Sequence, residues 1–293
     1  MSTRRWLNAH TTSLKGQWIA ITGATGGIGQ ELCRHLCRLE ASLILLDRNP
    51  EKSQALERTL KTEFPEAAIT RVPLDLADLT SVKAACDRLR EQPLDGLIHN
   101  AGAYHIPRYR CETGLDNVFQ INCASPYYLT RKLLPYMRPG ARIVVVGSIA
   151  HRYSRSDHAD IDFATRQESS KVYGNAKRRL MAAMYELFRE ESRVSLAVTH
   201  PGITFTNITN HYPKVIFTLI KHPMKVIFMK PKRACLSILQ GLFDTCVDHT
   251  WIGPRFFDIW GLPRKHRLRS IPPAESRRIF EEAEQIYRKM EGI

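Results

Sequence analysis

The sequence predicts an α/β fold: a doubly wound parallel sheet of the Rossmann type, formed as a single domain. Short apolar runs alternate with amphipathic helical stretches along most of the 293 residues. These runs are apolar throughout, which is typical of parallel strands that are covered by helices on both faces. The first run stops at a glycine-rich loop that opens a helix, and ligands bind at such strand ends in this fold.

The alternation gives each element in order. Strands are predicted at residues 17–22, 42–47, 68–72, 95–99, 142–147 and 193–199. Helices are predicted at residues 28–39, 50–62, 78–90, 115–136, 172–190, 231–245 and 274–290. Residues 203–230 break the pattern, so we expect a dinucleotide-binding and catalytic core at 16–200, a substrate lid at 203–230 and a C-terminal helix at 274–290.

The chain is basic, with 43 Lys and Arg against 29 Asp and Glu and a net charge of +14. This charge suits anionic ligands or surfaces without identifying either. No zinc-finger, homeodomain-like or RNA-binding aromatic motif accompanies it, so we expect no specific nucleic-acid binding.

The cysteines and the N-terminus indicate a reducing, intracellular location. There are seven cysteines, no Cys-x-x-Cys motif, and no second pair to match Cys33 and Cys37 as metal ligands. Buried free thiols and no metal site are therefore expected. Residues 1–17 lack the apolar region of a secretory signal, and no apolar stretch approaches the length of a spanning helix. We expect a cytoplasmic protein.

The first loop is the predicted pyrophosphate site. Glycines permit a tight turn and let the backbone approach a phosphate, while the following helix N-terminus supplies free amides and partial positive charge. A tight turn without a ligand is the alternative. The predicted binding residues of this loop are Thr22, Gly23, Thr25, Gly27, Ile28 and Gly29.

Two neighbouring residues at the end of the second strand favour different cofactors. Asp47 is placed to accept hydrogen bonds from the adenosine ribose and to repel a 2′-phosphate, by roughly 4 kcal/mol for unit charges about 4 Å apart at an effective dielectric of about 20. Arg48 would instead pair with that phosphate. Asp47 stands at the strand terminus itself, which favours NAD, with NADP as the alternative through Arg48. Asp47 could also only cap the helix that begins at Pro50.

Two further strand ends complete the predicted adenosine site. Asp75 and Leu76 follow the third strand, where the carboxylate could accept the adenine amino group or simply cap the next helix. The small residues Asn100, Ala101 and Gly102 follow the fourth strand and would let the backbone lie against the ribose and adenine.

The predicted catalytic group combines a helix and a strand end. Tyr173 and Lys177 are four residues apart and lie on one helix face. A nearby ammonium favours the phenolate, so Tyr173 could exchange a proton with an alcohol or ketone. Ser148 follows the strand at 142–147 and could hold the substrate oxygen. Asn122 could hold a water linked to Lys177 through its side chain or a distorted backbone, or be an ordinary helical amide.

Together these motifs resemble the short-chain dehydrogenase/reductase family, over residues 16 to about 253. The matching positions, in the family's order, are the loop 22–29, Asp75, 100–102, Asn122, Ser148, Tyr173, Lys177, Pro201 and Gly202. The resemblance implies a catalytic tetrad of Asn122, Ser148, Tyr173 and Lys177. It also implies nicotinamide contacts from Pro201, Gly202, Ile203 and Thr204 or Thr206.

Within the family the chain is most similar to the retinol-dehydrogenase-type branch. Shared features are a long insertion at 151–172, His-Pro-Gly at 200–202 and an acidic-rich C-terminal helix. Ala176 departs from that branch, which usually has Ser before the lysine. Gly26 stands where NADP-preferring members often carry a basic or polar residue, which adds to the NAD prediction.

The lid region bears on the kind of substrate, on membrane contact and on oligomer formation. Residues 211–233 carry six Lys or Arg and no acid, interleaved with apolar side chains. They could form a peripheral contact with an anionic membrane, or cover the active site with the apolar side inward. The latter predicts a small apolar alcohol or ketone substrate, although the same side chains could pack against a partner subunit in a homo-oligomer.

The leading functional hypothesis is hydride transfer between a nicotinamide dinucleotide and an apolar alcohol, ketone or aldehyde that is steroid-, retinoid- or lipid-like. One alternative is a catalytically silent, dinucleotide-sensing binding protein, which would not need Tyr173, Lys177 and Ser148 together. A second alternative is a membrane-surface protein driven by its basic segment. Histidines and acids at 151–162 fit no known metal-ligand spacing and are expected to form a solvated loop.

Overall fold

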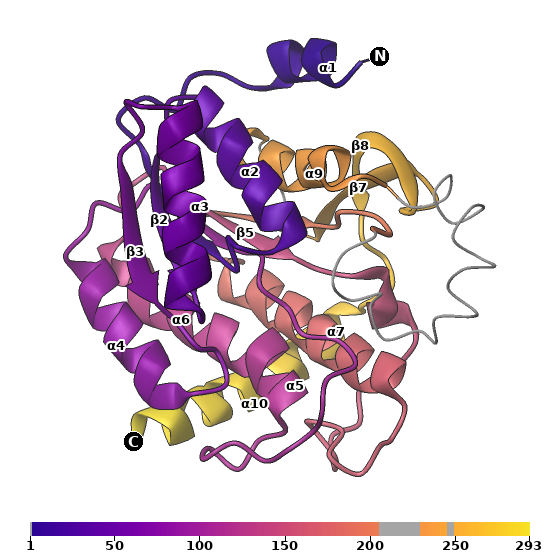
Figure 1. Ribbon diagram of the computed structural model, residues 1–293. Helices are drawn as coiled ribbons and strands as arrows, with labels where there is room; N and C mark the ends of the chain where they lie inside the picture. The colour runs from indigo at the N-terminus through magenta and orange to yellow at the C-terminus, as the bar shows by residue number, and fades with distance from the viewer. Residues whose placement is uncertain (1, 205–228, 245–248) are drawn as a thin grey trace, which may run out of the picture.

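The computed structural model describes residues 2–204, 229–244 and 249–293. In this part of the chain eight strands form one sheet in the order β3-β2-β1-β4-β5-β6-β7-β8, parallel except for β8 (Figure 1). Topology and helices confirm the predicted doubly wound fold. The strands are β1 (Trp18–Thr22), β2 (Ser42–Asp47), β3 (Ile69–Pro73), β4 (Gly96–His99), β5 (Arg142–Val146), β6 (Ser195–Thr199), β7 (Thr250–Phe256) and β8 (Trp260–Arg267).

Both faces of the sheet are buried, which explains why its strands are apolar throughout. In β1, Ile19 and Ile21 point into one core and Ala20 into the other, because successive side chains alternate between faces. One core contains α2 (Gly27–Arg38), α3 (Pro50–Glu63) and α9 (Pro231–Phe243). The other contains α4 (Leu79–Arg90), α6 (Ser125–Leu133), α7 (Ser169–Leu187) and α10 (Pro273–Glu291).

The helix predicted at 115–136 is interrupted. The structure has α5 (Asn117–Phe119), a π-helical turn η1 (Gln120–Ala124), α6 and the 3₁₀ turn η2 (Leu134–Tyr136). Pro126 has no amide hydrogen, so the usual helical bond to the carbonyl of Asn122 cannot form. The Asn122 side chain also donates to the carbonyl of Val118, at 2.8 Å. Such π turns often occur at functional sites.

Two elements were missed in the sequence. The first is α1 (Thr3–His10), a short helix capped by Ser2 and anchored by the buried Trp6. The second is the β7–β8 hairpin, whose Pro254 and Pro263 and basic residues disfavour a strand prediction. The edge strand β8 tolerates Pro263 and its charges, because both are common on sheet edges, and Pro254 lies beyond the residues of β7 that pair with β6.

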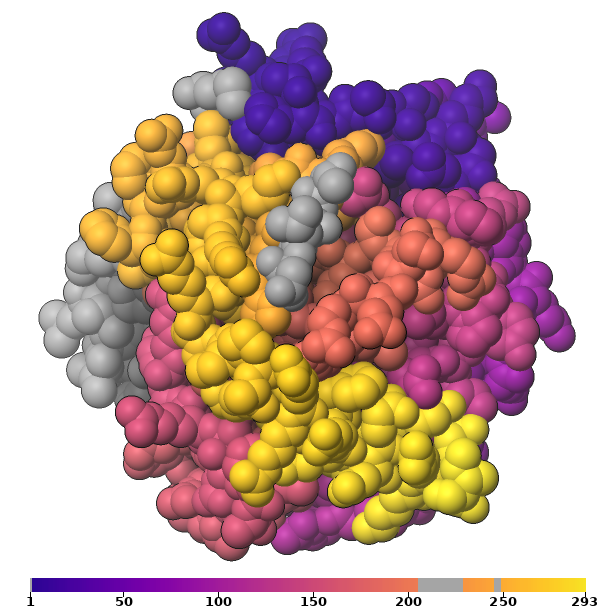
Figure 2. Space-filling model, turned by 180° about the vertical axis from the view of Figure 1, so that it is seen from behind, coloured from indigo at the N-terminus to yellow at the C-terminus, as the bar shows by residue number. Residues whose placement is uncertain are grey.

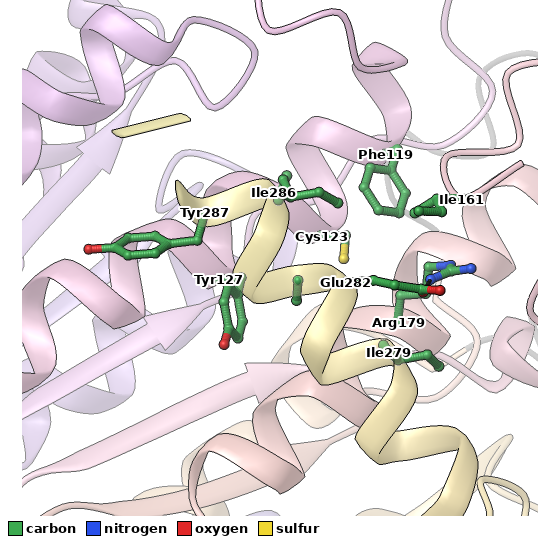
Figure 3. Close-up of a pocket in the computed structure, with 11 residues that line it drawn as sticks. Phe119, Cys123, Tyr127, Ile161, Arg179, Ile279, Glu282, Ile286 and Tyr287 are labelled. Atoms are coloured by element: carbon green, nitrogen blue, oxygen red, sulfur yellow. Dashed lines mark hydrogen bonds and ion pairs between the residues drawn. The ribbon is translucent and has the colours of Figure 1, made fainter. Parts of the chain in front are cut away.

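The C-terminal helix α10 packs against helix α7, which carries Tyr173 and Lys177. Figure 2 shows the C-terminal segment, in yellow, running across the surface of the molecule. Buried Arg178 and Arg179 of α7 form ion pairs with Glu275 and Glu282 of α10, with N–O distances of 2.5 Å. Figure 3 shows Arg179 and Glu282 together at the small cavity between the two helices.

The predicted lid at 203–230 lies almost wholly outside the described residues, since only 203–204 and 229–230 belong to them. Of the basic segment 211–233, only 229–233 are described. No helix in the described ranges is long and apolar enough to cross a bilayer.

Candidate active site

The glycine-rich loop after β1 is packed too closely for larger residues. Gly23 has a φ of +66°, and a Cβ there would lie 3.0 Å from the Cα of Ala101. A Cβ on Gly29 would lie 2.7 Å from the carbonyl oxygen of Ala24. Gly27 and Ile28 begin helix α2, so this loop delivers backbone amides to the carboxyl edge of the sheet.

The segment after β4 holds the loop in place. The Asn100 amide donates to the carbonyls of Thr22, at 3.1 Å, and Gly23, at 3.0 Å. The Thr22 hydroxyl accepts from the amide of Ala101, also at 3.0 Å. The Asn100 side chain thus supports the loop, while Ala101 and Gly102 face the pocket beside it.

A pocket of about 250 Å³ follows the ends of β1, β2, β3 and β4. It brings together nine predicted cofactor residues: Thr22, Gly23, Thr25, Asp47, Arg48, Asp75, Leu76, Ala101 and Gly102. Six lining residues were not predicted: Leu46, Asn49, Lys52, Leu74, Ala103 and Ile121. All of these except Lys52 directly adjoin predicted positions, so their sequence neighbours were the available signal.

The Asp47 carboxylate is hydrogen-bonded to other residues of the protein. It is 4% exposed, and one oxygen accepts hydrogen bonds from the Thr25 amide and hydroxyl, both at 2.9 Å. The other oxygen accepts from the Ser53 hydroxyl at 3.2 Å. Burial raises the pKa of Asp47, and these hydrogen bonds oppose the rise. Arg48, in contrast, is exposed on the same pocket.

The acidic residues after β3 have separate roles. The Asp75 carboxylate accepts from the amide of Ala77 at 2.9 Å, and Asp75 lines the pocket. The cap of α4 is Asp78, whose carboxylate accepts from the amide of Thr80. Asp75 is therefore not the helix cap, and it remains a predicted adenine contact.

The structure brings Tyr173, Lys177, Ser148 and Asn122 to one place. The Lys177 ammonium lies 5.7 Å from the centre of the Tyr173 ring and donates to the carbonyl of Val146 at 2.9 Å. A Cβ on Gly102 would lie 3.6 Å from that ammonium and 3.0 Å from the Asn122 Oδ1. Glycine at 102 therefore keeps open the space between the pocket after β1–β4 and these four side chains.

Burial changes the proton affinities of the catalytic pair. Burial lowers the pKa of Lys177 to about 8, with Cys123 opposing the change. Burial raises the pKa of Tyr173 to about 12, against a hydrogen bond with Ser148 that lowers it. At neutral pH the phenol therefore carries its proton and the lysine is largely an ammonium.

The Asn122 side chain forms three hydrogen bonds within the protein. Its amide donates to the carbonyls of Ala103 and Val118, both at 2.8 Å, and its oxygen accepts from the Ala103 amide at 3.2 Å. Among the described residues the oxygen of Asn122 accepts only this one bond and has a second lone pair, so a side-chain role and a backbone role both stay predictions. The π turn at Asn122 supplies the distorted backbone that the backbone role needs.

Ser148 is positioned by packing that the sequence did not reveal. A Cβ on Gly147 would lie 2.8 Å from the Sδ of Met181, so β5 ends tightly against α7. The His151 Nδ1 lies 2.6 Å from the Ser148 carbonyl, and its Nε2 lies 2.7 Å from the Ser270 hydroxyl. Burial lowers the pKa of His151 to about 4, so the ring is neutral and its Nδ1 donates to the carbonyl.

Gly174 and Tyr104 are further residues that the sequence analysis missed. A Cβ on Gly174 would collide with the carbonyl of Ala150, so glycine lets α7 approach the 3₁₀ turn η3 (Ile149–Arg152) beside Ser148. The Tyr104 ring meets the Tyr173 ring edge-on, with centroids 5.4 Å apart. The position of Gly174 directly after Tyr173 was the only sequence signal.

The predicted nicotinamide contacts follow β6. Gly202 has a φ of +81°, and a Cβ there would lie 2.7 Å from the carbonyl of Ile259. Thr204 bridges to Met229, and His200 stacks on Trp251 with ring centroids 5.5 Å apart. Pro201 to Thr204 thus leave the sheet at the carboxyl edge of β6, whereas Thr206 lies outside the described residues.

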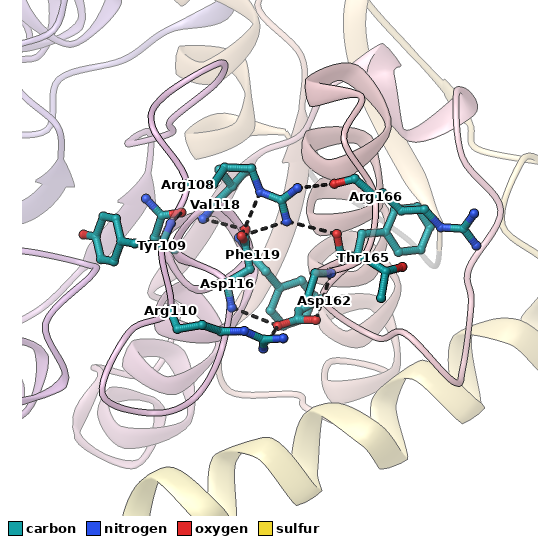
Figure 4. Close-up of polar contacts among 12 residues, drawn as sticks. Arg108, Tyr109, Arg110, Asp116, Val118, Phe119, Asp162, Thr165 and Arg166 are labelled. Carbon is teal, nitrogen blue, oxygen red and sulfur yellow. Dashed lines mark hydrogen bonds and ion pairs between the residues drawn. The ribbon is translucent and has the colours of Figure 1, made fainter.

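The insertion between Ser148 and Tyr173 is tied to the loop after β4 by an ionic network (Figure 4). Arg108 pairs with Asp116 at 2.8 Å and donates to the carbonyls of Phe163 and Arg166. Asp162 accepts from the Asp116 amide at 2.8 Å. These bonds hold the insertion against the loop after β4. Among the described residues no cluster suits a metal ion, and the six described cysteines are free and buried.

Comparison with known families decides the assignment. A family model described as short chain dehydrogenase matches residues 17–214, more than half of the chain. The chain belongs to the short-chain dehydrogenase family. Its tetrad positions and glycine loop lie inside the matched range.

Named relatives are similar over the same region. Retinol dehydrogenase 14 from Mus musculus is 33% identical over 214 residues, covering 68% of this chain and 64% of that protein. Retinol dehydrogenase 13 from Homo sapiens is 30% identical over 206 residues, covering 68% and 62%. These matches support the retinol-dehydrogenase-type branch. The chain spans a little under two thirds of the length of these relatives.

Solved structures share the fold. An uncharacterised protein from Mycobacterium paratuberculosis superposes with a TM-score of 0.77 at 25% identity, covering 96% of each chain. RhlG from Pseudomonas aeruginosa, in a complex with NADP, has a TM-score of 0.60 at 23% identity and covers 80% of this chain and 93% of its own.

The residues present fit a nicotinamide dinucleotide. The glycine cradle at 23–29 suits a pyrophosphate, and the pocket beyond it runs to the exposed Arg48 and Lys52. Gly102 leaves space between this pocket and Lys177. The residues predicted to bind the pyrophosphate and the adenosine, and those predicted to be catalytic, therefore lie along the carboxyl edge of the sheet. The crossover between β1 and β4 lies at this edge, where such folds bind ligands.

Proposed function

We propose that this protein is an oxidoreductase that interconverts an apolar alcohol and its ketone or aldehyde with a nicotinamide dinucleotide. The observation that carries the proposal is the convergence of Tyr173, Lys177 and Ser148 beside the cofactor pocket. A bound dinucleotide would supply or accept the hydride. The family assignment supports this reading, while a silent sensor would have no need for a catalytic group held this closely.

Tyr173 acts as the proton donor or acceptor. In the reducing direction its phenol, protonated at neutral pH, donates to the carbonyl oxygen of the substrate. In the oxidising direction the phenol must first lose its proton. Lys177 favours that loss, because an ammonium close to the ring stabilises the phenolate.

Ser148 and Lys177 hold the reacting groups. The Ser148 hydroxyl, at the end of β5 and hydrogen-bonded with Tyr173, orients the substrate oxygen toward the phenol. Lys177 lies beside Gly102 at the junction with the cofactor pocket, where its ammonium binds the nicotinamide ribose. Asn122 contributes through the π turn, whose backbone holds a water on the path from Lys177.

The substrate is apolar and larger than a short-chain ketone. Relatives named retinol dehydrogenase and polyprenol dehydrogenase act on apolar alcohols by name, and we extend that substrate class to this chain. The sequence of the lid agrees, because residues 203–230 contain many aliphatic and aromatic side chains. Burial of a ligand against them would contribute roughly 25 cal/mol per Å² of apolar area.

The cofactor preference depends on the two residues at the end of β2. The sequence favours NAD through Asp47, whose carboxylate would repel a 2′-phosphate bound in the pocket that Asp47 lines. The structure adds an argument for NADP, because Asp47 is bonded to Thr25 and Ser53 while Arg48 and Lys52 are exposed on the pocket. We propose that Arg48 determines the cofactor preference and that the protein uses NADPH at least as well as NADH.

The test follows dinucleotide absorbance with ketones and aldehydes of increasing apolar size, from short-chain ketones to steroids and retinoids. Tyr173→Phe is the matched control for background oxidation of the cofactor. We expect turnover that requires Tyr173 and a kcat/KM that rises with apolar size. Values that are flat or fall with size would reject the substrate class, and no turnover with any member would reject the enzyme proposal in favour of the sensor.

A further inference from the structure

A second cavity lies on the opposite side of the sheet from the catalytic helix. It has a volume of about 460 Å³, within the range of small-molecule sites. Helices α1, α2 and α9 surround it, near the indigo N-terminal end in Figure 1. Its lining residues are Thr3, Arg4, Leu7, Asn8, Thr11, His35, Arg38, Leu39 and Lys232.

The charges of this cavity are all positive. Arg4 comes from α1, Arg38 from the end of α2 and Lys232 from the start of α9, so three separate elements place a cation here. All three side chains are exposed, and none forms an ion pair with an acid among the described residues. The Arg38 guanidinium lies over the Phe64 ring, 5.5 Å from its centroid, and this contact leaves its N–H groups able to bind an anion. No acidic residue lines the cavity.

A buried histidine opens into the same space. His35 is 1% exposed, and neither ring nitrogen has a hydrogen-bond partner of normal geometry in the described part of the protein. Burial lowers the pKa of His35 and the charge of Arg38 lowers it further, while the backbone of Lys232 opposes the change. The contact with the Lys232 backbone is too poorly aligned to satisfy the ring, and a buried polar group without a well-formed hydrogen bond costs free energy, so a ligand atom that pairs with it is stabilising.

The apolar part of the lining narrows the ligand class. Leu7 and Leu39 supply aliphatic surface beside the cations, and Trp6 anchors α1 so that the wall is fixed. The cavity is also far larger than an inorganic phosphate. It therefore suits an anion that carries an apolar portion, with Asn8 and Thr3 as further hydrogen-bond donors.

We propose that the cavity between α1, α2 and α9 binds a phosphate ester joined to an apolar group, such as the headgroup of an anionic lipid. The phosphate pairs with Arg4, Arg38 and Lys232, and a phosphate oxygen or hydroxyl pairs with His35. This site is separate from the catalytic group, so it does not depend on the proposed oxidoreductase activity.

The test compares a cavity variant with a charge-matched control. The cavity variant carries Arg4→Gln, Arg38→Gln and Lys232→Gln. The control carries Arg5→Gln, Lys15→Gln and Arg255→Gln, which removes the same charge from exposed residues outside the cavity. Binding is measured by co-sedimentation with phosphatidylcholine vesicles with and without phosphatidic acid, and by calorimetry with glycerol phosphate. Melting curves check that each protein is folded, and single substitutions replace any triple variant that is not.

We expect the cavity variant to bind at least about tenfold more weakly than wild type and the control to bind within about twofold. Binding to phosphatidic acid vesicles alone identifies the lipid as the source of the phosphate. Binding to glycerol phosphate as well identifies a site that also takes free esters. Equal losses in both variants would overturn the proposal in favour of general charge attraction, and so would wild type that binds neither probe.

Discussion

The two ends of the cofactor groove treat charge in different ways. At the catalytic end, Lys177 is 2% exposed and burial shifts the proton affinities of both Lys177 and Tyr173. At the adenosine end, Arg48 and Lys52 are exposed, and only the carboxylate of Asp47 is buried. Water screens exposed charges. A substitution at the catalytic end should therefore lower activity more than a substitution at the adenosine end.

The largest expected effect is at Tyr173. Tyr173→Phe removes the proton donor and keeps the ring, so kcat should fall by roughly 10²–10⁴-fold, the usual contribution of general acid–base catalysis. Dinucleotide binding, measured by fluorescence titration, should change little because Lys177 and the glycine loop remain. A variant that keeps more than about a tenth of the activity would remove Tyr173 from the proposed role.

The pH dependence tests Lys177. Burial lowers its pKa to about 8, so the free protein loses the ammonium as pH rises through that value. The kcat/KM for ketone reduction should therefore fall above about pH 8, since this parameter reports the free enzyme. Lys177→Arg keeps its charge, so any activity that it retains should lack this fall. A wild-type profile that stays level well above pH 8 would contradict the assignment.

The lowered pKa of Lys177 also affects stability, which should rise with pH where activity falls. The buried ammonium is destabilising at and below about pH 8, because an unfolded lysine keeps its proton up to about 10.5. The contribution of Lys177 to the free energy of unfolding should therefore rise with pH between these values. The difference in melting temperature between wild type and Lys177→Met, followed across this range, measures it. A difference that does not vary with pH would mean that Lys177 is not desolvated.

The smallest effect is expected at the adenosine end. Arg48→Ala should lower kcat/KM with NADPH by about tenfold and leave the value with NADH nearly unchanged, in line with one charge-assisted phosphate contact. High salt should reduce the difference. If the wild type preferred NADH and the Asp47→Ser variant lost this preference, Asp47 rather than Arg48 would determine the cofactor preference.

The features that depend on neighbours close in the chain could be predicted from the sequence. The loop 22–29, the strand ends at Asp47, Asp75 and 100–102, and the Tyr173–Lys177 pair depend on neighbours close in the chain. Strand and helix periodicity carries that information, and the topology then brings the strand ends to one edge.

The remaining features depend on contacts that are distant in the chain. His151 reaches Ser148 and Ser270, and Gly147 packs against Met181. The Asp47 carboxylate turns to Thr25 because the loop offers it an amide and a hydroxyl, which residue types alone do not indicate. The β7–β8 hairpin was missed because an edge strand accepts prolines and charges that a central strand would exclude.

The most direct test of the central claim is an ultraviolet titration of the Tyr173 phenol, taken as the difference between wild type and Tyr173→Phe. In the free protein the phenol should ionise near pH 12 because burial raises its pKa. With the oxidised dinucleotide bound, the positive nicotinamide beside it should lower this pKa by about one unit or more. An unchanged pKa in the presence of saturating dinucleotide would contradict the account, because Tyr173 would then not face the cofactor.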